Sequence, residues 1–167
     1  MVDIESEGPC PGLYSMISFG AVVVDEKLDK TFYGKLKPIS DIWVPEALAV
    51  SGFTREQTLE FDDPSKVMAE FETWLNNLHS RPYFISDNNG FDFCFMNHYC
   101  WNYLDKNPFG YSSTNLGSLY KGMVKDTFKN FKHLRKTNHT HHPVQDCIGN
   151  CEALLEMKKM GLKINLD

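Results

Sequence analysis

The sequence predicts an α/β fold in which a mixed β-sheet, antiparallel at its N-terminal strands and parallel later, is flanked by helices. Three observations lead to this prediction. The chain begins with apolar, β-branched runs separated by short turns, its later part alternates strand-like and helical segments, and several helical segments carry an apolar stripe on one face. A length of 167 residues fits one domain, so we expect residues 1–167 to form a single domain.

The first strands are predicted from short apolar patterns. Residues 1–5 have the pattern of a strand end, and residues 17–24 are apolar and β-branched. Residues 31–37 alternate between apolar and polar side chains, as a half-exposed strand does. The short connection between the last two segments predicts a hairpin, and a further short strand is expected at 83–86.

Helix start signals mark the rest of the chain. Pro45 and Pro64 suit first helical turns, Asp63 is a cap, and Thr54 with Gln57 fits a capping box. We therefore expect helices at 45–50, after 54, from 64 to about 78, at 91–104 and from 143 to about 161, with a polar loop at 105–117 and a basic segment at 121–136.

Four acidic residues lie where strands end and helices begin. Asp3 and Glu5 are two residues apart on the first strand, so their side chains share one face. Asp92 follows the polar turn after the last predicted strand, and Asp146 lies in the first turn of the helix that Pro143 opens. Each pattern alone is also typical of a solvated acid or of an acid stabilised by a helix dipole.

A histidine near Asp146 and the acidic pair on the first strand indicate what chemistry these residues could perform. His141 lies five residues before Asp146, on the loop before the last helix, although a lone histidine there is more often a surface residue. Two acids on one face of a hydrophobic strand require water or cations, because buried charge without compensation is costly. Oxygen ligands of this kind suit Mg²⁺.

Together these motifs resemble the DEDDh branch of the ribonuclease H-like 3′–5′ exonucleases. They are D-x-E at 3–5, N-x-x-F-D at 88–92 and H-x4-D at 141–146, in that order. The resemblance covers nearly the whole chain and is greatest to the small bacterial and phage exoribonuclease group. Other segments that resemble this family lie at 17–22, 32–36, 49–54, 85–88 and 133–136.

The resemblance implies a ribonuclease H-like fold and a site for two divalent cations, Mg²⁺ or Mn²⁺. Asp3 would contact both ions, Glu5 and Asp146 would hold the ion nearer the attacking water, and Asp92 would hold the other. His141 would be the general base, since the ordinary histidine pKa of about 6.5 suits that role at neutral pH. His142 is the alternative base, but its spacing to Asp146 does not match the family pattern.

Several residues are expected to contact the substrate. The net charge is −5, but two cations would offset most of it, and the basic segment 121–136 contains one acid. A solvated surface is the alternative interpretation of that segment. The residues expected at the nucleotide are Ser6, Met16, Phe91, Arg135, Lys136 and His139, with Phe19 as a further stacking candidate.

The resemblance favours RNA as substrate, either single-stranded or as a 3′ overhang, with DNA as the alternative. The products would be 5′-mononucleotides, that is, nucleoside monophosphates, and related exonucleases suggest a homodimer. A membrane span and a secretory signal are not expected, and five cysteines without framework spacing indicate reduced thiols. We therefore expect a cytoplasmic enzyme.

Two other classes of protein are compatible with parts of the sequence. A zinc-binding interaction module could use the histidines and cysteines between 139 and 151, although Cys147 and Cys151 also fit an apolar helix stripe. A catalytically weak nucleotide-binding protein is the second alternative, because Met1 lies only two residues before Asp3 and the first strand is short.

Overall fold

The computed structural model describes residues 1–166, and its first three strands form an antiparallel sheet in the order β1-β2-β3. These strands are β1 (Val2–Ser6), β2 (Met16–Val22) and β3 (Thr31–Lys35). Asp3 is opposite Gly20 in the register, and Glu5 is opposite Ser18. All of β2 is buried, whereas β3 alternates, with Tyr33 exposed and Gly34 buried, as its sequence predicts.

A second, two-stranded sheet contains β4 (Phe84–Ser86) and β5 (Ser113–Asn115), which are parallel. The β4 strand touches β1, so both sheets contribute to the same central layer. The strand β5 and the helix α5 (Leu116–Val124) lie where the sequence predicts a polar loop and a basic segment. Parallel pairing of the later strands is confirmed.

The predicted helices are present, and their starts follow the local capping chemistry. Pro45 and Pro64 are the first residues of the helices α1 (Pro45–Val50) and α3 (Pro64–Asn77). Asp63 caps α3 by accepting a hydrogen bond from Ser65 N–H. The Thr54 capping box is formed in full. The remaining bounds are α2 (Arg55–Leu59), α4 (Asn89–Leu104), the 3₁₀ helix η1 (Lys132–Leu134) and α6 (Pro143–Lys159).

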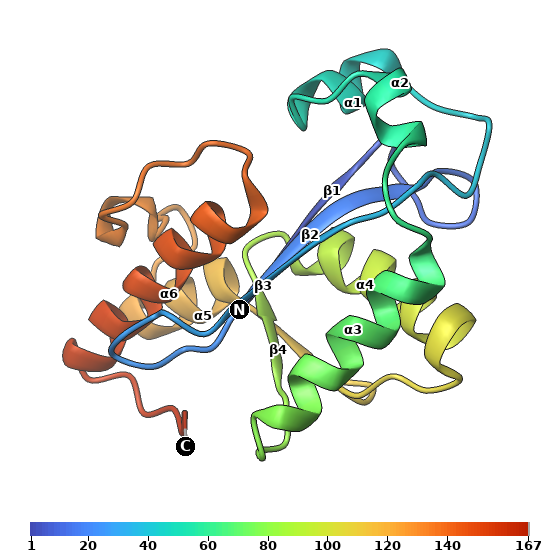
Figure 1. Ribbon diagram of the computed structural model, residues 1–167. Coiled ribbons are helices and arrows are strands. Elements are labelled where there is room, and N and C mark those ends of the chain that lie inside the picture. The colour runs from blue at the N-terminus through green and yellow to red at the C-terminus, as the bar shows by residue number, and fades with distance from the viewer. Residues whose placement is uncertain (167) are drawn as a thin grey trace.

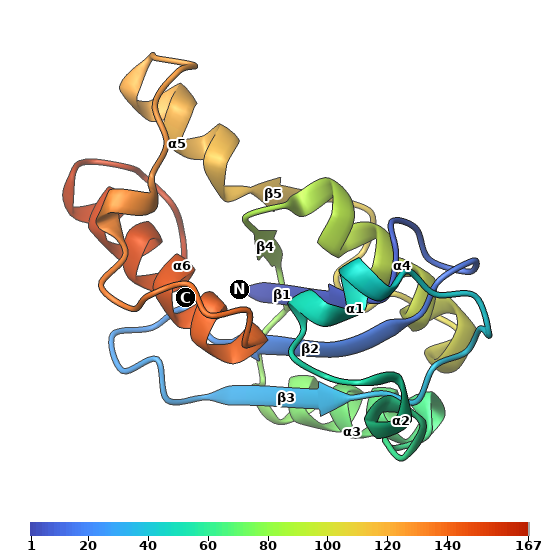
Figure 2. The same cartoon turned by 90° about the horizontal axis from the view of Figure 1, so that it is seen from above.

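Helices cover the sheet on both sides, as Figures 1 and 2 show. The helices α3 and α4 pack together on one side, and α6 lies against β1 and β2 on the other. Each side has its own hydrophobic core, one centred on Phe19, Phe71 and Tyr99, the other on Cys147, Cys151 and Leu154. Among residues 1–166, no helix combines the length and apolar character that a bilayer crossing requires.

Candidate active site

The four predicted carboxylates come from three different elements. Asp3 and Glu5 are on β1, Asp92 is in the first turn of α4, and Asp146 is in the first turn of α6. Asp92 and Asp146 are each 2% exposed, and Glu5 is 8% exposed. Since α4 and α6 contact β1 from opposite sides, the two helix starts bring their acids to the strand that carries the other two.

The approach of α6 to the sheet depends on a glycine. A Cβ atom at Gly20 would lie 2.5 Å from the backbone nitrogen of Val144 and 2.6 Å from the carbonyl carbon of Pro143. Any side chain at Gly20 would therefore push the start of α6 away from β2. Because Gly20 is paired with Asp3, this contact also determines how close Asp146 comes to the acids of β1.

The carboxylates are close enough to share cations. One ligand atom from each of Asp3, Glu5 and Asp146 falls within a group whose members are all within 4.8 Å of one another. Asp92 also lies near this group, and its charge therefore raises the pKa of Asp3 and of Glu5. Asp92 Oδ2 is buried and has no hydrogen-bond partner among the described residues. An unpartnered buried carboxylate oxygen beside three other acids fits a site for hard divalent cations.

Without cations, this density of acids favours protonated carboxyl groups. Burial is the largest cause of the raised pKa of Glu5, which is about 8, and the charges of Asp146 and Asp92 add to it. Burial also raises the pKa of Asp92 to about 7. The pKa of Asp3 is well above its ordinary value, first because of burial and then because of its acidic neighbours. Divalent cations would reverse these shifts by favouring the ionised forms.

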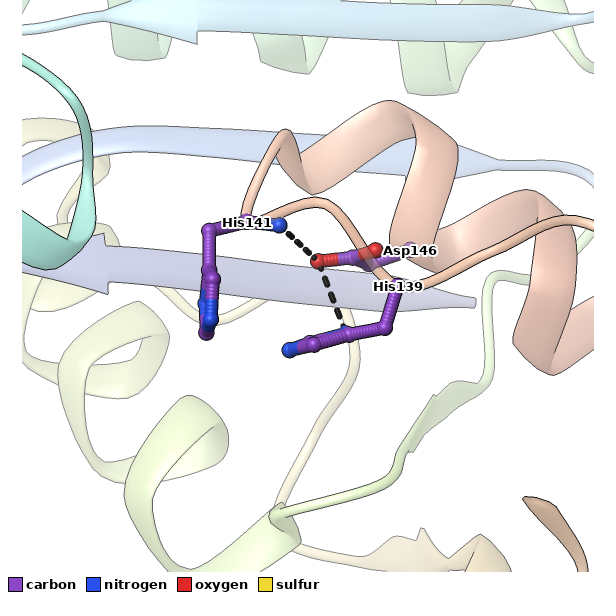
Figure 3. A group of neighbouring side chains, drawn as sticks. All are labelled: His139, His141 and Asp146. Carbon is purple, nitrogen blue, oxygen red and sulfur yellow. Dashed lines mark hydrogen bonds and ion pairs between the residues drawn. The ribbon is translucent and has the colours of Figure 1, made fainter.

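The loop before α6 adds two imidazole rings to the acidic group (Figure 3). Asp146 accepts hydrogen bonds from the backbone N–H groups of Thr140 and His141, each at 2.9 Å. The Nδ1 atom of His139 is 3.0 Å from Asp146 Oδ2, and the rings of His139 and His141 lie edge to face. His141 has a positive φ of 59°, a conformation that the hydrogen bonds to Asp146 stabilise.

The position of His141 differs from that of its neighbour. His141 Nδ1 is 3.8 Å from Glu5 Oε1, and its side chain is 49% exposed, so the ring lies beside the carboxylates and remains open to solvent. The ring of His142 instead packs at a tilt against Tyr33 of β3. This arrangement favours the expectation that His141, rather than His142, is the base.

The zinc module suggested by the sequence is not assembled. Cys147 and Cys151 are fully buried in the core, where burial raises the pKa of both thiols. The histidines instead group with a carboxylate, since ligand atoms of His139, His141 and Asp146 are all within 4.8 Å of one another.

Arg135 makes its polar contacts within the protein. Its side chain is only 8% exposed, and it is paired with Asp87 at 2.8 Å and with Asn150 at 2.5 Å. It also lies over the ring of Phe131. The guanidinium group therefore joins the turn after β4 to α6, and its expected contact with a substrate phosphate stays a prediction.

Asp87 is the residue of the site that the sequence analysis missed. Its charge raises the pKa of both Asp3 and Asp92, so it lies at the edge of the acidic group. Asn115, at the start of α5, donates a hydrogen bond to its carbonyl oxygen at 2.6 Å. Within the polar turn 86–90, its sequence position alone gave no signal that separated it from the neighbouring asparagines.

The other expected substrate contacts differ in their surroundings. Met16 is fully buried, and Phe91 is partly buried and packs against Phe95; their expected nucleotide contacts stay predictions. The Ser6 hydroxyl is buried and donates to the carbonyl of Gly8, which supports the turn after β1. Phe19, the further stacking candidate, is also fully buried. Lys136 is exposed, and its backbone N–H is bonded to Glu152 on α6.

The chain is similar in sequence to known proteins. The model of the exonuclease family RNase_T matches residues 1–154. The chain is 40% identical over 127 residues to the 3′-5′ DNA exonuclease Cap18 of Escherichia coli, an alignment that covers 73% of this chain and 67% of that protein.

Solved structures share the fold at low sequence identity. The cell-death related nuclease 4 (CRN-4) superimposes with a TM-score of 0.77 at 16% identity, over 96% of this chain and 63% of that one. A 3′-exonuclease solved with a histone mRNA stem-loop gives a TM-score of 0.74 at 17% identity, over 96% and 80% of the two chains. The ribonuclease H-like mixed fold expected from the sequence is confirmed, and the chain spans just under two thirds of the CRN-4 structure.

Proposed function

Because the chain belongs to the RNase_T exonuclease family, we propose that its clustered acids and His141 hydrolyse the phosphodiester bonds of DNA from the 3′ end. The enzyme class, a 3′–5′ exonuclease, follows from the family and from the 40% identity to a 3′-5′ DNA exonuclease. The RNA preference expected from the sequence is not supported by that relative, which favours the DNA alternative. Single-stranded DNA or a 3′ overhang is therefore the proposed substrate.

The observation that supports the proposal best is the convergence of four acids around β1. Asp3, Glu5 and Asp146 would hold divalent cations together with Asp92, whose Oδ2 atom has no protein partner among the described residues. When bound, Mg²⁺ or Mn²⁺ would stabilise the negative charge that develops on the oxygens of the phosphate under attack. The protein contributes buried oxygen ligands that are held in place by three elements.

The remaining chemistry falls to the loop before α6. With Nδ1 of His141 directed toward Glu5, Nε2 is the ring nitrogen left to accept a proton from the attacking water. The imidazolium that results would lie beside the Glu5 carboxylate. The hydrogen bonds from Thr140 and His141 to Asp146 hold the loop in place for this transfer. The products would be a 5′-mononucleotide and a DNA strand that is one nucleotide shorter.

The test uses one sequence prepared as DNA and as RNA, each labelled at its 5′ end. We expect a ladder that shortens from the 3′ end with Mg²⁺ or Mn²⁺, faster on DNA, and no reaction with chelator. Asp146→Asn is the matched control, since it keeps the size of the side chain but removes its charge, and it should produce no ladder.

Each other outcome has a defined meaning. A faster ladder on RNA would overturn the DNA assignment and leave the exonuclease assignment standing. Activity that survives chelation would overturn the role of cations. Binding of both oligonucleotides without any shortening would show the catalytically weak nucleotide-binding protein that the sequence left open.

A further inference from the structure

Phe128 is the most exposed large hydrophobic residue among those described, with 97% of its surface accessible. It lies on the turn between α5 and η1. In Figure 2 this turn follows the end of α5 that is farther from β5. Tyr111 is also exposed, at 88%, but its hydroxyl group can interact with water. Phe128 has no polar atom in its side chain, so its exposure is unfavourable unless another molecule covers the ring.

The turn that carries Phe128 is held by hydrogen bonds at and before Phe128. Lys125 adopts the left-handed conformation that ends α5, and Asp126 N–H donates to the carbonyl of Lys121 at 3.1 Å. The Asp126 carboxylate then accepts from the N–H of Phe128 at 2.9 Å. Three residues later, Phe131 is buried at 2% exposure. The backbone therefore presents Phe128 outward from a defined turn.

Four lysines lie within seven residues of Phe128 in the sequence. The lysines at 121, 125, 129 and 132 are all exposed, and Asp126 is the only acid between them. Among the residues that the structure describes, no carboxylate forms an ion pair with any of these four side chains, since the paired lysines lie elsewhere. Exposed lysines without ion pairs on the same segment as an exposed aromatic ring are a combination that binds phosphates and stacks on a base of single-stranded nucleic acid.

The place of this turn relative to the acids defines which part of a substrate it could contact. The helix α5 is capped at its start by Asn115, which donates a hydrogen bond to the carbonyl oxygen of Asp87 at the edge of the acidic group, and it ends beside the turn. Nine helical residues at about 1.5 Å each make α5 about 13 Å long. A strand with about 3.4 Å between stacked bases would need roughly four nucleotides to cover that distance.

We propose that Phe128 and the lysines at 121, 125, 129 and 132, the Phe128 platform, form a second binding site for the substrate strand. The ring would stack on a base several nucleotides upstream of the 3′ end, and the lysines would bind the adjoining phosphates. This inference rests on the proposed function. Nucleic acid fits better than the same face of a second copy, because two such platforms would bring eight lysines together.

The experiment compares two substrate lengths with Phe128→Ala. For a 20-nucleotide strand we expect KM to rise about 10-fold, as the loss of one stacked base would cause, with kcat unchanged. For a dinucleotide, which cannot reach the platform, KM and kcat should equal those of the wild type. Phe128→Trp should restore the low KM of the long strand. Lys129→Ala should reduce the slope of log affinity against log salt by about 1 for the long strand only.

The outcomes separate this inference from the proposed function. Equal KM values for wild type and Phe128→Ala on the long strand would overturn the platform, while normal hydrolysis of the dinucleotide would leave the exonuclease assignment intact. A similar rise in KM with both the long strand and the dinucleotide would also overturn the platform, because the effect of Phe128→Ala would then act at the acidic site. If Phe128→Ala instead halves the mass in solution by light scattering, the ring covers a second copy of the chain and the platform is refuted.

Discussion

Replacing Glu5 by glutamine should stabilise the cation-free protein at alkaline pH. The folded state raises the pKa of Glu5 from 4.5 to about 8, mainly through burial and then through Asp146 and Asp92. The folded protein therefore binds this proton more tightly than the unfolded chain does. Stability is lost as pH rises from the unfolded value to the folded one, here between about 4.5 and 8. At about 1.36 kcal/mol for each pKa unit, the ionised side chain costs up to about 5 kcal/mol at pH 9.

Urea denaturation in the presence of chelator measures this effect. Glu5→Gln should raise the free energy of unfolding by about 3 to 5 kcal/mol at pH 9 and by less than about 1 kcal/mol at pH 5. Added Mn²⁺ should stabilise the wild type at pH 9 and the variant much less, because a ligand is missing. If Glu5→Gln destabilises the protein at pH 9 in chelator, neither burial nor the neighbouring carboxylates make the ionised Glu5 side chain unfavourable in the folded state.

Three further changes test the elements that build the site. His141→Ala should lower kcat by about 100-fold or more, measured on labelled DNA, while Mn²⁺ binding is retained. Arg135→Ala should lower the free energy of unfolding in urea by about 2 to 3 kcal/mol, because it leaves the buried Asn150 and the partly exposed Asp87 without their partner. Gly20→Ala should cost about 1 to 3 kcal/mol in the same assay and also lower kcat, because its Cβ pushes away the start of α6.

Matched variants control two of these changes. His142→Ala should leave kcat within a few-fold of the wild type, and an equal loss in both histidine variants would contradict the choice of base. Gly122→Ala places a methyl group in open space on α5 and should be neutral or stabilising by up to about 1 kcal/mol. Full activity in Gly20→Ala would show that α6 does not depend on this contact. Unchanged stability in Arg135→Ala would show that its buried pairs contribute nothing.

Local chemistry explains why much of the fold was predictable. Helix starts at Pro45, Thr54 and Pro64 are determined by neighbouring residues, and the structure has them where the sequence places them. The strand β5 and the helix α5 were missed for the opposite reason. β5 has only three residues and pairs with β4, far away in the sequence, and α5 contains two glycines, which are weak helix formers.

The site shows the same division between local and distant causes. Asp92 and Asp146 lie in first helical turns next to recognisable motifs, so their positions could be inferred from the chain. The burial of Arg135 could not, because its partner Asp87 is 48 residues away. A lysine- or arginine-rich segment looks the same in sequence whether its side chains are paired or free. Sugar preference was equally beyond the motifs, since it depends on contacts with the 2′-OH group.

Binding of Mn²⁺ at pH 8, measured by calorimetry on wild type and Asp3→Asn, tests most directly whether cations hold these acids together. We predict two Mn²⁺ ions for each wild-type chain and loss of at least one in Asp3→Asn, with the same fold by circular dichroism. Equal binding by both proteins, or no binding by either, would contradict the account.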